Sequence, residues 1–348
     1  MSNHSTRMAA DNPSRRAGTK PACQDSGRQA IMVEVLVFDD DADFYVTEAG
    51  KTLPAIRLVA ATDEASALAQ GKNAEILVAM AHKVTPQLVA AMPHLRFIQA
   101  LTTGTDHLAT LTLPPGIAIA SMRGMHGPQM AEVAFLYMLA LSRNAVKMHD
   151  NQRQATWQRW PQPLLLDKTM VIIGVGAISE ALAHRARAFG MRVVGVSDSR
   201  STAADFDEIL PRRDLIAAAG RADFLVVLAP LTPATRGMID APVFAAMKPR
   251  AIFINLARGP VVNEAALIEA LRAGRIGGAG LDVFDTEPLP PDSPLWALPN
   301  TLVTPHIGGM SDIYARQALP ILIDNLHLWQ TGGASALRNL VELTGAAS

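Results

Sequence analysis

Three residues suited to proton transfer and anion binding follow apolar segments late in the chain. Arg258 comes after AIFINLA (251–257), Glu287 comes after GAGLDVF (278–284), and His306 closes TLVTPH (301–306). Histidine exchanges a proton near neutral pH, and the arginine fork binds carboxylates. If the apolar segments are parallel strands, their carboxyl ends border the ligand crevice of an open α/β sheet. We therefore expect these three residues to face one site.

A glycine-rich turn upstream has the spacing of a dinucleotide-binding motif. MVIIGVGAISEALAHRARAFG (170–190) contains Gly174 and Gly176 and places Ser179 where the third glycine of G-x-G-x-x-G is usual. Gly174 permits the tight turn out of the strand, and Gly176 lets a pyrophosphate approach the backbone. A helix beginning near Ala177 offers free N–H groups to that anion. The third glycine only packs helix against strand, so serine is a mild change.

The segments after this turn support the same interpretation. Asp198 ends the next apolar run about 20 residues later, where a carboxylate binds the ribose hydroxyls of NAD. A 2′-phosphate needs a cation instead, and Ser197, Ser199 and Arg200 could hold one, so NAD is expected and NADP is the alternative. The helix after the glycine turn is expected to pack on the sheet through one apolar face. That face carries Ile178, Leu182, Ala186 and Phe189.

Short apolar runs alternate with helical patterns along the whole chain. Because the runs are almost continuously Val, Ile and Leu, they predict strands buried on both faces of parallel sheets. Two successive alternations predict an α/β fold with two doubly wound domains. The predicted strands are 31–38, 56–61, 75–80, 95–101 and 117–122, then 169–176, 192–197, 224–230, 251–257, 278–284 and 301–306. The predicted helices are 62–71 and 85–92, capped by Thr62 and Thr85, a long one from Pro128 to Gln154, and a closing one from Ser311 to Gln330.

Composition limits the class of protein. The chain has 348 residues, enough for two domains, and its 31 basic and 32 acidic residues give no overall field for nucleic acid or an anionic membrane. The one cysteine, Cys23, excludes a disulfide framework and a cysteine-rich metal site. No apolar run is long enough for a membrane span. We expect a cytoplasmic enzyme without a metal.

The first 30 residues have a different composition. Ser, Asn, Arg, Pro and Gly dominate there without any helix or strand period, which predicts a disordered tail. A transit peptide is the alternative, and Met32 could be the functional start.

The stretch from about residue 75 to 330 resembles the D-isomer-specific 2-hydroxyacid dehydrogenases. The shared motifs are GVGAIS, APLTPATRGMI, the ARG stretch, LDVFDTEPL and TPHIGG, in the family's order. GMHGPQMAE and DSPLWALPN resemble the glyoxylate/hydroxypyruvate reductase-like branch. The resemblance implies a Rossmann-type NAD domain over 125–309 and a flavodoxin-like substrate domain formed by 31–124 and 310–348. The implied activity is hydride transfer between NAD(P)H and a small 2-oxo acid or D-2-hydroxy acid.

The resemblance also implies roles for particular residues. His306 would donate the proton, Glu287 would stabilise its protonated imidazole, and Arg258 would bind the substrate carboxylate and polarise its carbonyl. The backbone around Thr103 and Gly104 would grip the same carboxylate. Further cofactor contacts would come from Ala257 and Asp282 at the nicotinamide carboxamide, Pro230 and Leu231 beside the adenine, and Thr235 near the phosphates.

Several alternatives remain at this stage. A nucleotide-sensing binding protein of the same fold, like the co-repressors, would bind NADH without turnover. The resemblance implies a homodimer formed through the region of Trp157 and Trp160, which would either approach the partner's site or pack between domains. His126 could contact ligand or serve only the turn before the long helix. The pocket wall could include Met310, Tyr314 and Trp296.

Overall fold

The computed structural model describes residues 32–342. The tail expected over residues 1–30, its Cys23, and the last six residues of the predicted substrate domain lie outside this range.

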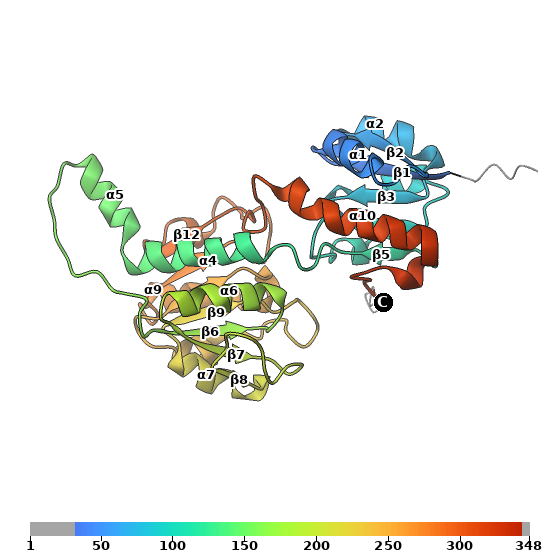
Figure 1. Cartoon of the computed structure of the whole chain (residues 1–348). Helices are drawn as coiled ribbons and strands as arrows, with labels where there is room; N and C mark the ends of the chain where they lie inside the picture. Colours follow the sequence, from blue (N-terminus) through green and yellow to red (C-terminus); the bar gives the residue numbers. More distant parts are fainter. Residues whose placement is uncertain (1–31, 343–348) are drawn as a thin grey trace, which may run out of the picture. The chain divides into compact units, whose positions relative to one another are not determined.

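The first part of the described chain builds a five-stranded parallel sheet (Figure 1). Its strand order, β2-β1-β3-β4-β5, is the order of flavodoxin-like sheets. The strands are β1 (Val33–Phe38), β2 (Ile56–Ala61), β3 (Ile76–Ala79), β4 (Phe97–Ala100) and β5 (Ala118–Ala120). Each of them lies within a predicted strand.

Helices cover both faces of this sheet. Alternate residues of β1 show the division, because Val35 and Val37 face one apolar cluster and Leu36 and Phe38 face the other. The first cluster includes α1 (Ala42–Gly50) and α10 (Tyr314–Gly332). The second includes α2 (Glu64–Gln70) and α3 (Pro86–Ala91). The sheet is therefore doubly wound, as predicted.

The N-caps of α2 and α3 test the predicted helix starts. Thr85 caps α3 as predicted and accepts a hydrogen bond from Leu88 N at 3.1 Å. The prediction of Thr62 for α2 was wrong, because Asp63 takes that place and accepts from Ser66 N at 2.8 Å. Asp63 lies one residue nearer the helix, where its carboxylate reaches the third amide of the first turn.

The second part of the chain builds a seven-stranded parallel sheet with the order β12-β11-β10-β9-β6-β7-β8. Six of its strands lie within predicted ones: β6 (Thr169–Ile173), β7 (Arg192–Val196), β9 (Phe224–Val227), β10 (Ile252–Asn255), β11 (Gly278–Leu281) and β12 (Thr301–Val303). The edge strand β8 (Glu208–Leu210) was not predicted, because its three residues are at most partly buried and form no apolar run.

Helices again lie on both faces. One apolar cluster joins the sheet to α4 (Gly127–Ser142) and α6 (Ala177–Ala188). The other joins it to α7 (Leu215–Arg221), α8 (Ala241–Ala246) and α9 (Glu264–Arg272). Short 3-10 turns occur at Gly71–Asn73, Ala81–Lys83, Leu108–Thr110, Arg212–Asp214, Gly259–Val261, Pro294–Trp296 and Ala334–Ala336.

The long helix predicted from Pro128 to Gln154 is two helices. After α4 the chain turns at Asn144, whose φ is +59°, and α5 (Ala145–Arg153) begins. Asparagine adopts this left-handed conformation more readily than most residues. The prediction of one continuous helix was therefore wrong, because the apolar pattern of the sequence contains no sign of the break at Asn144. The closing helix begins at Tyr314, three residues later than predicted.

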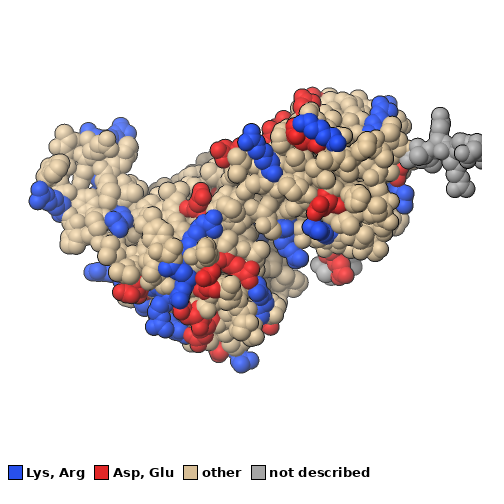
Figure 2. Space-filling model, viewed as in Figure 1, with Lys and Arg blue, Asp and Glu red and all other residues tan. Residues whose placement is uncertain are grey.

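Two features of the described residues concern the surface. Acidic and basic side chains are interspersed on the face drawn in Figure 2.

Between residues 32 and 342, every helix is too short or too polar to cross a lipid bilayer.

Candidate active site

The turn between β6 and α6 has the geometry that a pyrophosphate needs. Gly174 has a φ of +93°, and a Cβ there would lie 2.6 Å from the backbone N of Ala229. A Cβ on Gly176 would meet nothing within 4 Å. The N-terminus of α6 follows at Ala177 with no side-chain cap. This open backbone beside free helix N–H groups fits a dinucleotide.

Ser179 shows why the altered motif is tolerated. Its side chain is buried, and its Oγ donates to the carbonyl of Gly174 at 2.5 Å, tying the helix back to the turn. Leu182 and Ala186 are buried on the same helix, as predicted, and Ile178 packs against the same cluster. Phe189 departs from the predicted face: it is 47% exposed and stacks on Phe135, with ring centroids 4.7 Å apart.

The end of β7 holds groups suited to both cofactors. Asp198 accepts from the backbone N of Arg212 and pairs with its Nη2, each at 2.9 Å. Arg200 pairs with Glu180 at 2.7 Å, and Ser197 Oγ accepts from the backbone N–H of Ser199 and Arg200. Asp198, expected to bind ribose, thus has an ionic partner in this structure. So does Arg200, which could bind a phosphate.

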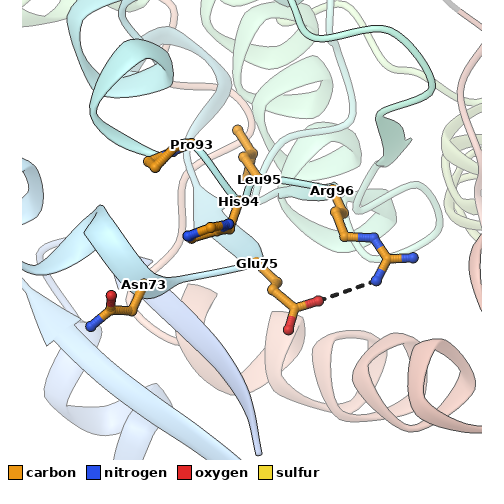
Figure 3. A pocket seen from close by; sticks show the side chains of 6 residues that line it. All are labelled: Asn73, Glu75, Pro93, His94, Leu95 and Arg96. Carbon is orange, nitrogen blue, oxygen red and sulfur yellow. Dashed lines mark hydrogen bonds and ion pairs between the residues drawn. The ribbon is translucent and has the colours of Figure 1, made fainter. Parts of the chain in front are cut away.

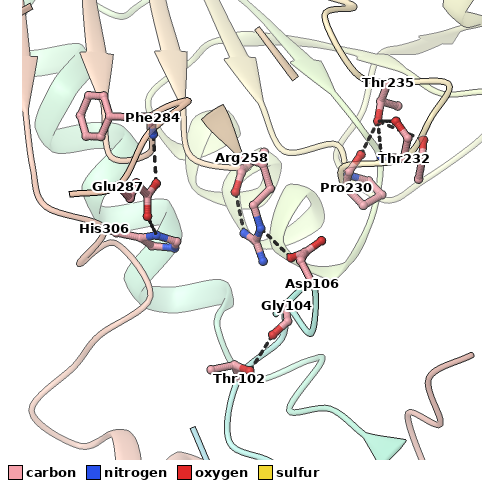
Figure 4. A network of polar contacts seen from close by, with 11 residues as sticks. Thr102, Gly104, Asp106, Pro230, Thr232, Thr235, Arg258, Phe284, Glu287 and His306 are labelled. Atoms are coloured by element: carbon pink, nitrogen blue, oxygen red, sulfur yellow. Dashed lines mark hydrogen bonds and ion pairs between the residues drawn. The ribbon is translucent and has the colours of Figure 1, made fainter. Parts of the chain in front are cut away.

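The loop after β9 is closed by Thr235. Its hydroxyl donates to Pro230 O at 2.7 Å and accepts from Thr232 N at 2.8 Å (Figure 4). Leu231 lies between these residues and packs partly against the apolar cluster of the sheet. The hydroxyl of Thr235 therefore shapes the loop predicted to flank the cofactor.

His306 and Glu287 are in contact, as the resemblance implied (Figure 4). Nδ1 of His306 lies 2.7 Å from Oε2 of Glu287, while Oε1 accepts from Phe284 N at 3.0 Å. The bond to Glu287 raises the pKa of His306 against the opposing effect of burial. Burial alone would raise the pKa of Glu287, but the hydrogen bonds from His306 and Phe284 together lower it. The pair therefore favours a charged imidazole beside a charged carboxylate.

Arg258 reaches the segment after β4. Its Nε donates to Asp106 Oδ2 at 2.8 Å and its Nη1 to Ala257 O at 2.6 Å. A Cβ on Gly104 would lie only 1.5 Å from Nη2, so the guanidinium lies directly against the glycine backbone. The structure thus brings together Arg258 and Gly104, which are far apart in sequence. Asp106 was not predicted, although it lies in the same TTGTDHL stretch.

Asp282 is buried and supports the loop that carries His306. It accepts from Thr304 Oγ1 at 2.5 Å, Ile307 N at 2.9 Å and Gly308 N at 2.8 Å. Both carboxylate oxygens of Asp282 are thus engaged by the loop after β12. The predicted contact of Asp282 with the nicotinamide would add to this positioning role.

The remaining predicted wall residues differ in exposure and in hydrogen bonding. Met310 is 61% exposed, Trp296 donates from Nε1 to Pro290 O at 2.9 Å, and Tyr314 is half-buried with a bonded hydroxyl. A hollow of about 590 Å³ lies elsewhere, at the amino ends of β3 and β4 (Figure 3). It is lined by Asn73, Glu75, Pro93, His94, Leu95 and Arg96. Within residues 32–342, no group of three His, Cys, Asp or Glu side chains is placed to hold a metal.

A dinucleotide turn and a histidine–carboxylate pair on a doubly wound sheet define an NAD(P)-dependent oxidoreductase. Comparison with known proteins identifies the family. Residues 135–308 match the model of the D-isomer specific 2-hydroxyacid dehydrogenase NAD binding domain. The chain therefore belongs to the D-isomer-specific 2-hydroxyacid dehydrogenase family, which relatives along most of its length also support.

Two curated relatives illustrate the similarity. Glyoxylate/hydroxypyruvate reductase B of Escherichia fergusonii is 36% identical over 266 residues, which are 73% of this chain and 81% of that one. The Mus musculus glyoxylate reductase/hydroxypyruvate reductase is 37% identical over 246 residues, covering 67% and 74%.

Two solved structures are similar over nearly their full lengths. A D-isomer specific 2-hydroxyacid dehydrogenase family protein from Aeromonas salmonicida has a TM-score of 0.84 at 32% identity, covering 90% of this chain and 99% of that one. The NADPH-dependent glyoxylate/hydroxypyruvate reductase of Sinorhizobium meliloti, solved with NADP and sulfate, has a TM-score of 0.77 at 29% identity, covering 90% and 99%.

Proposed function

We propose that this protein reduces a small 2-oxo acid to the corresponding 2-hydroxy acid, of D configuration where the product is chiral. The observation that carries the proposal is the contact between His306 and Glu287, 2.7 Å apart. An imidazole whose pKa is raised by a carboxylate is a proton donor matched to a developing alkoxide.

Arg258, His306 and Glu287 each have a role in this reaction. Arg258, with the backbone of Thr103 and Gly104, binds the substrate carboxylate and polarises the C2 carbonyl. NAD(P)H supplies the hydride to C2 when it is bound. The carbonyl electron pair moves to oxygen, which takes the proton from Nε2 of His306. The imidazole becomes neutral, and Glu287 stabilises its charged form before the transfer.

We propose that the turn after β6 holds the cofactor, with NAD as the preferred form and NADP as the alternative. The open backbone at Gly176 supports pyrophosphate binding. Asp198 favours NAD, because its carboxylate would repel a 2′-phosphate. Arg212, paired with Asp198, and Arg200, paired with Glu180, are the cations that favour the alternative. The contacts come from Gly174, Gly176, Ala177, Ile178, Ser179, Asp198, Arg200, Pro230, Leu231, Thr235, Ala257 and Asp282.

Glyoxylate and hydroxypyruvate are the proposed substrates. The names of the Escherichia fergusonii and Mus musculus relatives support this choice. We also propose that residues 31–124 and 310–348 form the substrate domain and residues 125–309 the dinucleotide-binding domain. The separate apolar clusters around the two sheets support this division.

We propose a cytoplasmic homodimer, formed through α5 and the segment that follows it. In α5 no residue is buried, and large apolar side chains are exposed around it, among them Val146 at 52%, Trp157 at 87% and Leu164 at 56%. Apolar surface of this kind is typical of a covered interface. A second copy of this chain is the proposed partner, and sedimentation equilibrium should report a dimer in solution.

The decisive assay measures NADH and NADPH oxidation with glyoxylate, hydroxypyruvate, pyruvate and a bulkier 2-oxo acid. The wild type should turn over one of the small acids, and His306→Ala and Arg258→Ala should lose that activity. His327→Ala, on the exposed side of α10, is the matched control and should behave as wild type. Tight NADH binding with no turnover of any acid would instead support the nucleotide-sensing alternative.

A further inference from the structure

His126 is a buried histidine with no part in the roles assigned above. It is 6% exposed and immediately precedes α4. Its Nδ1 lies 2.7 Å from Thr103 Oγ1, and its Nε2 lies 3.0 Å from the hydroxyl of Tyr314, the first residue of α10. The imidazole therefore joins the loop after β4 to the starts of two helices.

The hydrogen bonds of Tyr314 assign the protons in this chain of contacts. Its hydroxyl donates to the carbonyl of Leu101, so its oxygen accepts from His126 Nε2–H. A neutral imidazole has one donor and one acceptor nitrogen, so Nδ1 accepts the proton of the Thr103 hydroxyl. Burial lowers the pKa of His126 to about 4, which keeps the ring neutral at physiological pH.

These bonds fix the segment whose backbone is proposed to receive the substrate. Leu101 is held through its carbonyl, Thr103 through its hydroxyl, and Thr102 Oγ1 donates to Gly104 O at 2.6 Å. The hydroxyl of Thr103 is therefore directed to His126. At its end, Gly104 lies against Arg258.

We propose that His126 and Tyr314 are positioning residues that hold residues 101–104 in the conformation that binds the carboxylate of a 2-oxo acid. This inference rests on the proposed function. His126 exchanges no proton with the substrate and acts through its hydrogen bond to Thr103, whereas Tyr314 holds Leu101 directly. Loss of His126 should therefore weaken binding of the carboxylate, with little change in the rate of the chemical step.

The test measures the affinity of the enzyme–NADH complex for oxamate, an unreactive 2-oxo acid analogue, by calorimetry. Thr103→Val removes the hydroxyl at constant shape and should weaken oxamate binding by about tenfold, the effect of one hydrogen bond. The KM for the 2-oxo acid should rise in parallel while kcat is largely kept. Thr103→Ser restores the hydroxyl and should recover most of the affinity.

Two amide substitutions separate the two nitrogens of the ring. In His126→Asn the amide oxygen can occupy the Nδ1 position and still accept from Thr103, so affinity should fall little. In His126→Gln the amide nitrogen reaches the Nε2 position and keeps only the hydrogen bond to Tyr314. The loss of oxamate affinity should therefore match that of Thr103→Val. The double variant of Thr103→Val and His126→Gln should lose no more than either single change, because both remove one interaction.

Controls distinguish positioning from a general loss of structure. Thr110→Val removes an exposed hydroxyl that bonds to His107 O, beyond residues 101–104, and it should leave oxamate affinity unchanged. The melting temperature and NADH affinity are measured for every variant. Wild-type oxamate affinity in Thr103→Val, or loss of NADH and oxamate binding together, overturns the inference.

The outcomes also separate this inference from the proposed function. If the wild type binds oxamate but reduces no 2-oxo acid, the proposed function fails and the positioning role is still measured by affinity. If the wild type turns over and every variant matches it, the function stands and the inference is wrong. A wild type that reduces a 2-oxo acid but binds no oxamate leaves the function standing and contradicts the inference.

Discussion

Arg258 donates from Nε to Asp106 Oδ2 at 2.8 Å, joining the loop after β10 to the loop after β4. The two side chains are 30% and 49% exposed, so solvent weakens the pair and it adds little to folding stability. Its effect is instead on orientation, because it leaves Nη2 against the backbone of Gly104. If Arg258 binds the substrate carboxylate as proposed, Asp106 competes with that carboxylate for the same guanidinium.

Asp106→Asn should lower the KM for the 2-oxo acid. The amide still accepts from Arg258 but no longer offers a competing negative charge, and an exposed pair of this kind changes binding by about threefold. Steady-state kinetics at low ionic strength would detect the change. Asp43→Asn, at an exposed site on α1, is the control. A higher KM in Asp106→Asn would mean that orientation outweighs competition.

Arg258→Lys should lower kcat/KM by about 100-fold although the charge is kept. Lysine cannot reproduce the planar fork that holds Asp106 and Ala257 while it binds a carboxylate. The comparison is Arg272→Lys on the exposed side of α9, which should match the wild type. Near-normal kinetics for Arg258→Lys would show that charge alone suffices.

Glu287→Gln should move the pH dependence of reduction to lower pH. In the proposed reaction, reduction needs protonated His306, so kcat/KM should be constant below the pKa of His306 and fall above it. Glu287 raises that pKa above its usual value; the neutral amide removes this effect, and the fall should begin at a more acidic pH. In the oxidation direction the neutral imidazole is the active form, so activity should rise with pH instead.

The pH profiles of wild type, Glu287→Gln and Glu269→Gln decide this point. Glu269 is exposed on α9, and its substitution should leave the profile in place. An unchanged profile for Glu287→Gln would show that another group titrates.

Gly176→Ala should weaken NAD(P)H binding without unfolding the protein. A Cβ at this position meets no protein atom within 4 Å, so the free energy of unfolding should change by less than about 0.5 kcal/mol. The methyl group would instead occupy space proposed for the pyrophosphate. Fluorescence titration with NADH measures the loss.

Gly174→Ala is the contrasting variant in the same turn. Its φ of +93° and the 2.6 Å approach to Ala229 should lower the free energy of unfolding by about 1–3 kcal/mol in urea denaturation. Equal stability of the two variants would contradict the distinction between a structural and a binding glycine.

Asp198→Asn should shift cofactor preference toward NADPH. The substitution removes a negative charge beside the proposed 2′-phosphate position and releases Arg212 from its ion pair. The ratio of kcat/KM for NADPH to that for NADH measures the shift. Asp205→Asn, at a carboxylate paired with His184, controls for charge at the surface and should not alter the ratio. A constant ratio in Asp198→Asn would place the discrimination elsewhere.

The local features of this protein were readable from its sequence. Each predicted strand formed, because strands buried on both faces must be continuously apolar. The glycine turn formed as expected, since only glycine has a φ of +93° without strain at Gly174. Local reasoning failed where its signal is weak: at β8, which has three partly exposed residues, and at Asn144, where a left-handed residue divides a continuous apolar pattern.

The sequence by itself determined which residue types stand at the ends of which strands, and so the class of chemistry. Only the tertiary structure decided their partners. Arg258 meets Asp106 across 152 positions, and His126 meets Tyr314 across 188. Periodicity and turn chemistry act over a few residues, whereas such contacts depend on the path of the whole chain between them. The same physical limit explains why His126 could be singled out as a residue but not assigned its partners.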